Sequence, residues 1–167
     1  MTEAVQFCEA MLRDPHMESR GIGFQVVAHF ASSAEPELLA DARRWLEESC
    51  ENWGLVDNLA PSVVAPLIQR HPHLIPDVVA WTGSSNLWVR RGAVVAFVPL
   101  VDDEDCRDAA FEIARRLSDD TEDLIHKAVG WLLREAGKRD PDRLAAFLLK
   151  NGPEIPRTTV RYAIERF

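Results

Sequence analysis

The chain has 167 residues, of which 47% are hydrophobic, so it can bury one substantial core and is expected to form a single domain over residues 1–167. Its 19 basic and 27 acidic residues give a formal net charge of −8, which argues against nonspecific coating of nucleic acid or anionic membranes but permits a local basic groove. Cys8, Cys50 and Cys106 form no C-x-x-C motif, and no apolar run approaches the roughly 20 residues of a bilayer span, so we expect a cytoplasmic protein with reduced thiols and no membrane partner.

Helices are predicted along nearly the whole chain, because apolar residues recur at spacings of three and four and β-branched alternation is nearly absent. Breaks are expected at five prolines that can open a helix but not continue one: Pro15, Pro36, Pro61, Pro72 and Pro141. Short connections make consecutive helices antiparallel neighbours. In chain order, the expected helices span residues 2–13, 17–32, 35–50, 53–59, 61–70, 73–82, 86–100, 103–117, 121–138, 140–150 and, approximately, 156–166.

A faint internal repeat accompanies these helices. Arg91-Gly92-Ala93 aligns with Lys127-Ala128-Val129 at a period of 36, and Arg20-Gly21-Ile22 lies 71 residues before Arg91, close to twice that period. A cation therefore recurs at one register of successive helical pairs, which is typical of a solenoid with a charged inner face. The predicted fold is an all-α, curved α-solenoid of antiparallel helical pairs.

The helix expected at 121–138 has a tryptophan on its polar side. Lys127, Trp131, Arg134 and Lys138 share the face opposite a broad apolar face, so Trp131 is surrounded by three cations away from the core. This arrangement favours a binding surface, although a half-buried tryptophan covered by the stems of basic side chains would give the same pattern. The apolar face consists of Leu124, Ile125, Ala128, Val129, Leu132, Leu133 and Ala136.

Two further segments carry candidate site residues. In the helix expected at 86–100, Arg91 projects away from the apolar face and could equally be a surface ion-pair partner. Trp53 and Asp57 are four residues apart and share one helix face, and an aromatic plane beside a carboxylate suits a cationic or cation-like ligand. The alternative is a capping or ion-paired Asp57 beside an ordinary packed tryptophan. As a helix-surface carboxylate, Asp57 is expected to contribute little to stability.

Motifs for metal or cofactor chemistry are absent from the sequence. The five histidines have no ligand spacing, and we find neither a phosphate-binding glycine loop nor a nucleophile elbow. We therefore expect no metal and no cofactor, and a metal-dependent hydrolase is disfavoured. Any catalysis must come from the tryptophan, aspartate and arginine residues.

Three segments together resemble the AlkD-like DNA alkylation-repair glycosylases, which are built from HEAT-like helical repeats. The segments are Asn-Trp-Gly-Leu-Val-Asp at 52–57, Asn-Leu-Trp-Val-Arg-Arg at 86–91 and His-Lys-Ala-Val-Gly-Trp-Leu-Leu-Arg-Glu at 126–135. The resemblance runs from about Met17 to the C-terminus. Relative to that family, the chain is expected to lack the usual first helical pair, and its net charge is acidic where the family is commonly basic.

The resemblance implies hydrolysis of the N-glycosidic bond of positively charged alkylated purines, such as 3-methyladenine and 7-methylguanine, in double-stranded DNA. Asp57 would stabilise the oxocarbenium-like sugar and position water, Trp53 and Trp131 would pack against the deoxyribose, and Arg91 would hold the DNA backbone. The cationic base is a good leaving group, so no general acid is needed. Further DNA contacts are expected from Arg20, Lys127, Arg134 and Lys138.

A noncatalytic helical-repeat scaffold that binds a protein partner or DNA is the alternative, and the net charge permits it. The glycosylase requires Asp57, whereas the scaffold does not. The sequence leaves open whether Trp88 lines the groove or packs into the core.

Overall fold

The computed structural model describes residues 1–152 and 154–165, and all regular secondary structure within them is helical. The α-helices follow one another as α1 (Thr2–Leu12), α2 (Met17–Ala31), α3 (Leu38–Glu48), α4 (Trp53–Leu59), α5 (Ala65–Arg70), α6 (Ile75–Ala80), α7 (Leu87–Val95), α8 (Glu104–Arg116), α9 (Asp123–Arg139), α10 (Pro141–Asn151) and α11 (Arg157–Ile164). A π-helical turn, η1 (Ala60–Val64), joins α4 to α5. The 3-10 turns η2 (Pro72–Leu74) and η3 (Trp81–Gly83) flank α6, and a third, η4 (Val98–Leu100), follows α7.

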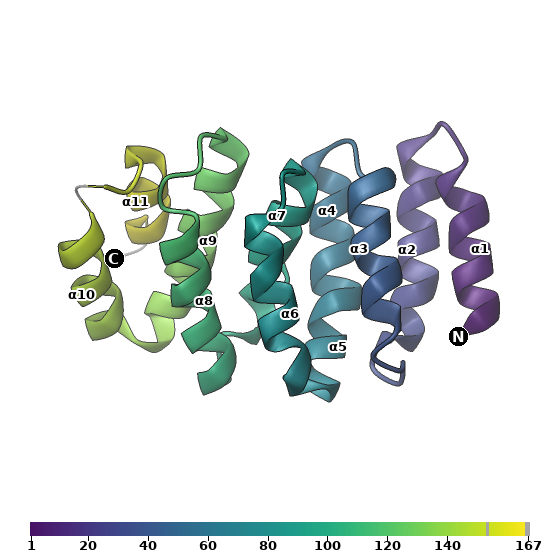
Figure 1. Cartoon of the computed structure of the whole chain (residues 1–167), viewed down its shortest axis with the longest axis horizontal. Helices are drawn as coiled ribbons and strands as arrows, with labels where there is room; N and C mark the ends of the chain where they lie inside the picture. The colour runs from purple at the N-terminus through teal and green to yellow at the C-terminus, as the bar shows by residue number, and fades with distance from the viewer. Residues whose placement is uncertain (153, 166–167) are drawn as a thin grey trace.

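The helices are stacked along the long axis of the molecule, with the N-terminus at one end and the C-terminus near the other (Figure 1). Helices α2, α4, α7, α9 and α11 pack side by side in that order, and we call them, with η1 and α5 as the continuation of α4, the inner layer. Helices α1, α3, α6, α8 and α10 pack against this layer and form the outer layer. The predicted α-solenoid of helical pairs is confirmed.

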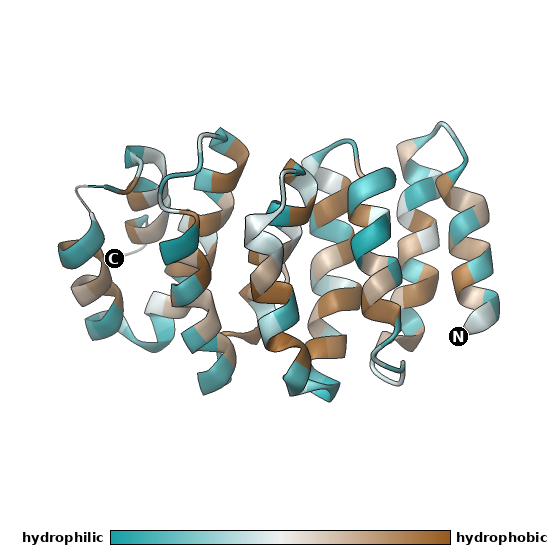
Figure 2. Cartoon of the chain, in the orientation of Figure 1, coloured by the Kyte–Doolittle hydropathy of each residue, from teal (hydrophilic) through white to brown (hydrophobic). Residues whose placement is uncertain are grey.

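One continuous hydrophobic core lies between the two layers and runs from Ala4 to Ala163. Its largest fully buried side chains include Trp45 and Phe24, whose ring centroids are 6.1 Å apart. Hydrophilic residues gather on the exposed turns of the outer helices, as Figure 2 shows for α3 and α8. Removal of apolar surface from water along this interface is the main favourable contribution to folding.

All three cysteines are buried free thiols. Burial raises the pKa of Cys8, Cys50 and Cys106 to about 12, so each thiol is protonated at neutral pH. Within the described part of the chain, none of the helices combines the length and the hydropathy needed to cross a bilayer.

The break predicted at Pro61 is wrong, because the chain continues helically from α4 through η1 into α5. Proline lacks the N–H that an α-helix requires at this position, and its ring would clash with the carbonyl one turn earlier. The π-helical turn widens the helix there, and the N–H of Ala65 donates to the carbonyl of Ala60. Such π turns are frequent at functional sites, and this one directly follows α4, which carries two of the candidate site residues.

Two other predicted helices are shorter than expected. The segment predicted as one helix over 73–82 contains only the short α6 between two 3-10 turns. The helix predicted over 86–100 ends at Val95, and Pro99 supplies no N–H to continue it. The remaining boundaries differ by up to three residues at either end, and residue 166 of the last predicted helix lies outside the described residues.

Close packing of α11 on α9 depends on Gly130. A Cβ atom placed there would lie 2.4 Å from the Cβ of Tyr162 and 2.7 Å from the backbone oxygen of Thr159. We expect Gly130→Ala to lower the free energy of unfolding by about 2 kcal/mol, as overpacking of an interface typically does. The measurement is urea denaturation of the variant against the wild type.

The matched control is Gly83→Ala, because a Cβ atom at Gly83 meets nothing within 4 Å. Its free energy of unfolding should stay within about 0.5 kcal/mol of the wild type. Equal stability of the Gly130 and Gly83 variants would contradict the close approach of α9 and α11.

Candidate functional site

A cavity of about 430 Å³ opens on the inner layer between α4, α7, α9 and α11. It brings together six residues that the sequence singled out, Trp53, Asp57, Arg91, Lys127, Trp131 and Arg134. Leu124, Ala128 and Tyr162 complete the lining. Periodicity had placed Leu124 and Ala128 on the apolar face, and no sequence signal marked Tyr162, because its place beside the cavity depends on how α11 docks on α9.

Two asparagines fix where the site helices begin. The side chain of Asn52 accepts a hydrogen bond from the N–H of Leu55 at 3.1 Å, so α4 begins at Trp53 and places Asp57 one turn later. The side chain of Asn86 accepts from the N–H groups of Trp88 and Val89 at 2.8 and 3.3 Å and caps α7 in the same way. These caps set the rotation of the helices that carry Asp57 and Arg91.

Arg91 and Asp57 form a bidentate ion pair across α7 and α4. The Nε of Arg91 donates to Oδ1 of Asp57 at 2.9 Å, and one terminal nitrogen donates to Oδ2 at 2.8 Å. The other terminal nitrogen donates to the backbone carbonyl of Leu124 on α9 at 2.6 Å. Arg91 leaves the apolar face of α7 as expected, but its side chain is only 7% exposed. The premise that Asp57 is a surface carboxylate is wrong, since its side chain is 20% exposed.

The ion pair leaves the carboxylate usable for chemistry. An ionised carboxylate has two oxygens with about four acceptor sites in total, and the guanidinium occupies one on each oxygen. Each oxygen of Asp57 therefore retains a lone pair for a water molecule or for a positively charged group in the cavity. Bidentate charge-assisted bonds also fix the plane of the carboxylate, so Asp57 presents these lone pairs in a defined orientation.

Aromatic side chains form two sides of the cavity. Trp53 is 57% exposed, so most of its ring is available to a ligand. Trp131 is half-buried: it packs against the core and also lines the cavity, where Lys127 and Arg134 lie beside it. Trp88, whose role the sequence left open, packs against the core and is not part of this lining.

The two cations at the cavity pair with carboxylates of α9 and of the residue after α11. Lys127 contacts Asp123 at 2.7 Å, and the hydrogen bond between them lowers the pKa of Asp123 and raises that of Lys127, so both stay charged at neutral pH. Arg134 contacts Glu135 at 3.3 Å and Glu165, just beyond α11, at 2.5 Å. Ion pairs to exposed carboxylates contribute little stability, so Asp123 and Glu165, which are 61% and 59% exposed, are readily exchanged for other anions.

The other two cations expected to contact DNA do not line the cavity. The guanidinium of Arg20 donates to the backbone carbonyls of Asp14 and Ser49 and pairs with Glu51, so it ties two interhelical loops together. Lys138 is exposed and pairs with Glu135. Their contacts to DNA remain predictions.

Charge is divided unequally between the two layers despite the net value of −8. The helices of the inner layer carry ten basic and four acidic side chains, whereas the outer helices carry seven basic and eleven acidic ones. The helices on the cavity side are therefore net positive, and the opposite side and the loops hold the excess of acid. A ligand with negative charge is attracted to the inner layer.

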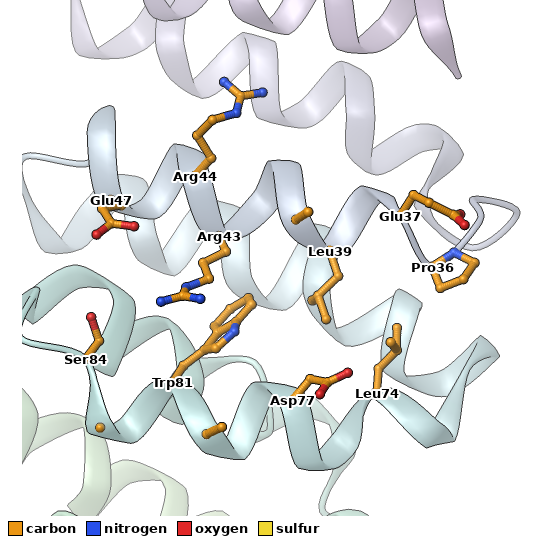
Figure 3. A pocket seen from close by; sticks show the side chains of 13 residues that line it. Pro36, Glu37, Leu39, Arg43, Arg44, Glu47, Leu74, Asp77, Trp81 and Ser84 are labelled. Carbon is orange, nitrogen blue, oxygen red and sulfur yellow. The ribbon is translucent and has the colours of Figure 1, made fainter.

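A larger cavity of about 800 Å³ lies on the outer layer between α3 and α6. Leu39 and Leu74 point into it from opposite sides, with Trp81 nearby, whereas Arg44 turns away (Figure 3). Its lining carries charges of both signs, the carboxylates of Glu37, Glu47 and Asp77 and the guanidinium groups of Arg43 and Arg44. It contains none of the candidate site residues. In the described residues, no group of three or more His, Cys, Asp or Glu side chains could hold a metal ion.

Comparison with known proteins places the chain among helical-repeat proteins of DNA repair. Residues 2–167 match the family model of the DNA alkylation repair enzymes. A structure described as a predicted DNA alkylation repair enzyme from Enterococcus faecalis is similar at 18% identity and a TM-score of 0.88, covering 99% of this chain and 76% of that chain. No protein with curated annotation matches significantly.

Two structures from Streptococcus mutans are similar as well. AlkD2 shares 20% identity with a TM-score of 0.77, covering 99% of this chain and 82% of that chain. The protein smu.31 of strain UA159 shares 21% identity with a TM-score of 0.76, covering 99% and 84%. At these identities the likeness concerns the fold.

The ion pair makes Asp57 important for stability. In Asp57→Asn, the buried guanidinium of Arg91 loses its charged acceptor, and we expect the free energy of unfolding to fall by about 2 kcal/mol, the typical value of a hydrogen bond to a charged group. Urea denaturation measures the change. Asp77→Asn, which alters an exposed carboxylate on the outer layer, is the control and should match the wild type. An unchanged midpoint for Asp57→Asn would be inconsistent with the buried pair.

Proposed function

Because the chain belongs to the family of DNA alkylation repair enzymes, we propose that it is a DNA glycosylase acting on positively charged alkylated purines. The observation that carries this proposal is the constrained carboxylate of Asp57 in a cavity lined by Trp53 and Trp131 on the basic layer of an otherwise acidic protein. The proposed substrate is double-stranded DNA that contains 3-methyladenine or 7-methylguanine.

The proposed reaction uses the charge that the lesion already carries. As the N-glycosidic bond breaks, its electron pair moves to the base and neutralises it, while positive charge develops on the deoxyribose. Asp57 stabilises this oxocarbenium-like sugar and accepts a hydrogen bond from the attacking water. The water oxygen bonds to the anomeric carbon as the proton in that hydrogen bond passes to the carboxylate and from there to solvent. Electrostatic stabilisation of developing charge is often the largest catalytic contribution. The faces of Trp53 and Trp131 add a favourable interaction with the cationic sugar.

Arg91 acts in this mechanism through Asp57. Each of its three nitrogens donates a hydrogen bond, two to Asp57 and one to the carbonyl of Leu124, and its side chain is only 7% exposed, so we assign it to positioning the carboxylate in place of the direct DNA contact that the sequence suggested. The bond to Leu124 also connects this pair to α9, the helix that carries Trp131. Orientation of a catalytic group within a few tenths of an ångström has a large effect on rate.

DNA phosphates would be held by the cations beside the cavity. Lys127 and Arg134 lie within the cavity lining, and their present partners are exposed carboxylates on the same layer. A phosphate can replace Asp123 or Glu165, because each of these carboxylates is more than half exposed and would be hydrated after it loses its cation. The acidic outer layer and loops would repel DNA, so that only the inner layer engages it.

The scaffold alternative is favoured by one feature, the outer cavity of about 800 Å³, whose lining combines apolar side chains with charges of both signs. A groove of this kind suits a segment of a partner protein that combines apolar and charged side chains. This alternative needs neither Asp57 nor the tryptophans of the inner layer.

Release of free base tests the proposed function. We expect the wild type to release 7-methylguanine and 3-methyladenine from methylated duplex DNA, and Asp57→Asn to be slower by about 100-fold or more, the loss typical of removing one electrostatic stabiliser. Rates are compared at a temperature where denaturation shows that both proteins are folded.

Asp77→Asn is the control and should release bases at the wild-type rate. Wild-type rates in folded Asp57→Asn would exclude the proposed role of this carboxylate. No release by the folded wild type would exclude the glycosylase and favour the scaffold.

Phosphate contact by Lys127 is tested through the salt dependence of DNA binding. Loss of one phosphate contact lowers the magnitude of the slope of log K against log salt by about 1. We expect this decrease for Lys127→Ala in titrations followed by fluorescence anisotropy. Arg43→Ala, which removes an exposed cation of the outer layer, should leave the slope unchanged. Identical slopes for all three proteins would remove Lys127 from the DNA interface.

A further inference from the structure

A second cavity of about 340 Å³ lies on the other side of α4 from the candidate site, between α2 and α4. Consecutive residues of α4 line the two cavities: Trp53 and Asp57 face the site, whereas Gly54 and Asn58 face the second cavity. Only one helix, about 10 Å wide, separates them. A ligand as large as a DNA duplex that is bound at the site would extend over this second cavity.

The second cavity has an apolar edge. Met17 and Ile22 of α2 are 49% and 55% exposed, and Trp53 continues this edge at 57% exposure. The side-chain nitrogen of Asn52, the residue that caps α4, donates to the sulfur of Met17 at 3.3 Å and holds Met17 beside the start of that helix. Half-exposed apolar side chains on adjoining helices form a surface that favours an uncharged, flat partner.

Polar contacts in the second cavity come from amides. The Nε2 of Gln25 donates to the Oδ1 of Asn58, which leaves the oxygen of Gln25 and the amide protons of Asn58 available to a ligand. Gly21 makes room for this pair, since a Cβ atom there would lie 3.3 Å from the Asn58 nitrogen. Among the described residues, Glu18 is the one charged member of the lining. A phosphate would find no cation here and would be repelled by that carboxylate.

We propose that the face of α2 and α4 formed by Met17, Ile22, Gln25 and Asn58 contacts the minor groove of the DNA duplex beside the lesion. Minor-groove proteins use this combination: asparagine and glutamine bond to base edges, and methionine or isoleucine press against or between base pairs. A distance of about 10 Å corresponds to about three base steps along a strand. The phosphates near the lesion lie on the side of Lys127 and Arg134, and the base pairs on the side of α2.

This inference rests on the proposed function and adds the part of the substrate that the catalytic cavity does not hold. It also gives the protein a way to open the helix. Apolar side chains pressed into the base stack favour unstacking and bending, and both expose the glycosidic bond of the lesion to Asp57. Met17 and Ile22 are therefore assigned to lesion-dependent distortion of the duplex.

The experiment uses duplexes that contain a central tetrahydrofuran abasic-site analogue with 2-aminopurine three steps away. The double variant Met17→Ser, Ile22→Ser and the single variant Gln25→Ala are compared with wild type by anisotropy at several salt concentrations and by 2-aminopurine fluorescence. We expect the double variant to bind about 10-fold more weakly and to lose the fluorescence increase, while its salt slope stays unchanged. Gln25→Ala, which alters an exposed side chain, should weaken binding a few-fold.

The matched control is Phe7→Ser, Leu149→Ser, which removes two exposed apolar side chains from the outer layer. It should bind and distort the duplex like the wild type. Thermal unfolding verifies that each variant is folded. Wild-type affinity and fluorescence in both the double variant and Gln25→Ala would overturn the inference.

Two outcomes separate this inference from the proposed function. If the wild type binds and distorts the duplex through Met17 and Ile22 but releases no base, the inference stands and the glycosylase fails. If base release is intact and both the double variant and Gln25→Ala bind and distort DNA like the wild type, the inference alone fails. Loss of wild-type self-association in the double variant, with DNA binding unchanged, would also overturn it and assign this face to a second copy of the chain.

Discussion

The bidentate pair between Asp57 and Arg91 connects three helices of the inner layer. Arg91 extends from α7 to the carboxylate on α4 and to the carbonyl of Leu124 on α9. A guanidinium that is 7% exposed needs partners for its charge and its donors, and here the two partner residues, Asp57 and Leu124, line the same cavity. The relative placement of the aromatic walls depends on this contact, because Trp53 belongs to α4 and Trp131 to α9.

Close approach between helices supports this geometry from both layers. Gly130 lets α11 lie against α9 and so brings Tyr162 to the cavity. Gly92 follows Arg91 in α7. A Cβ atom placed there would lie 2.5 Å from the Cδ1 of Leu46, so the absence of a side chain lets α3 of the outer layer pack directly on α7. Both contacts restrict how far the helices that hold the ion pair can shift, because a close-packed interface has no room for displacement.

The division of charge explains how an acidic protein can present a surface for DNA. The helices of the inner layer are net positive, and the acid is concentrated in the outer helices and the loops. Long-range attraction depends on the local field of the face that meets the ligand more than on the total charge. Beside the cavity, the cations are held by exposed carboxylates that a phosphate can replace, whereas the amide and apolar face of α2 and α4 has no cation at all.

The sequence by itself determined the all-α solenoid and most of the residues that line the candidate site. Periodicity within single helices is enough to place Trp53 with Asp57 and Lys127 with Trp131 and Arg134, since residues four or three apart share one face whatever the tertiary structure. Tertiary structure decided what these residues contact. Asp57 and Arg91 are 34 residues apart, and only the packing of α4 beside α7 makes them a buried pair. Tertiary packing also decides that Arg20 binds the backbone of a loop and that Tyr162 of α11 lines the cavity. The spacing of residues along the chain determines which side chains share one face of a helix. What that face packs against depends on helices that are distant in the sequence.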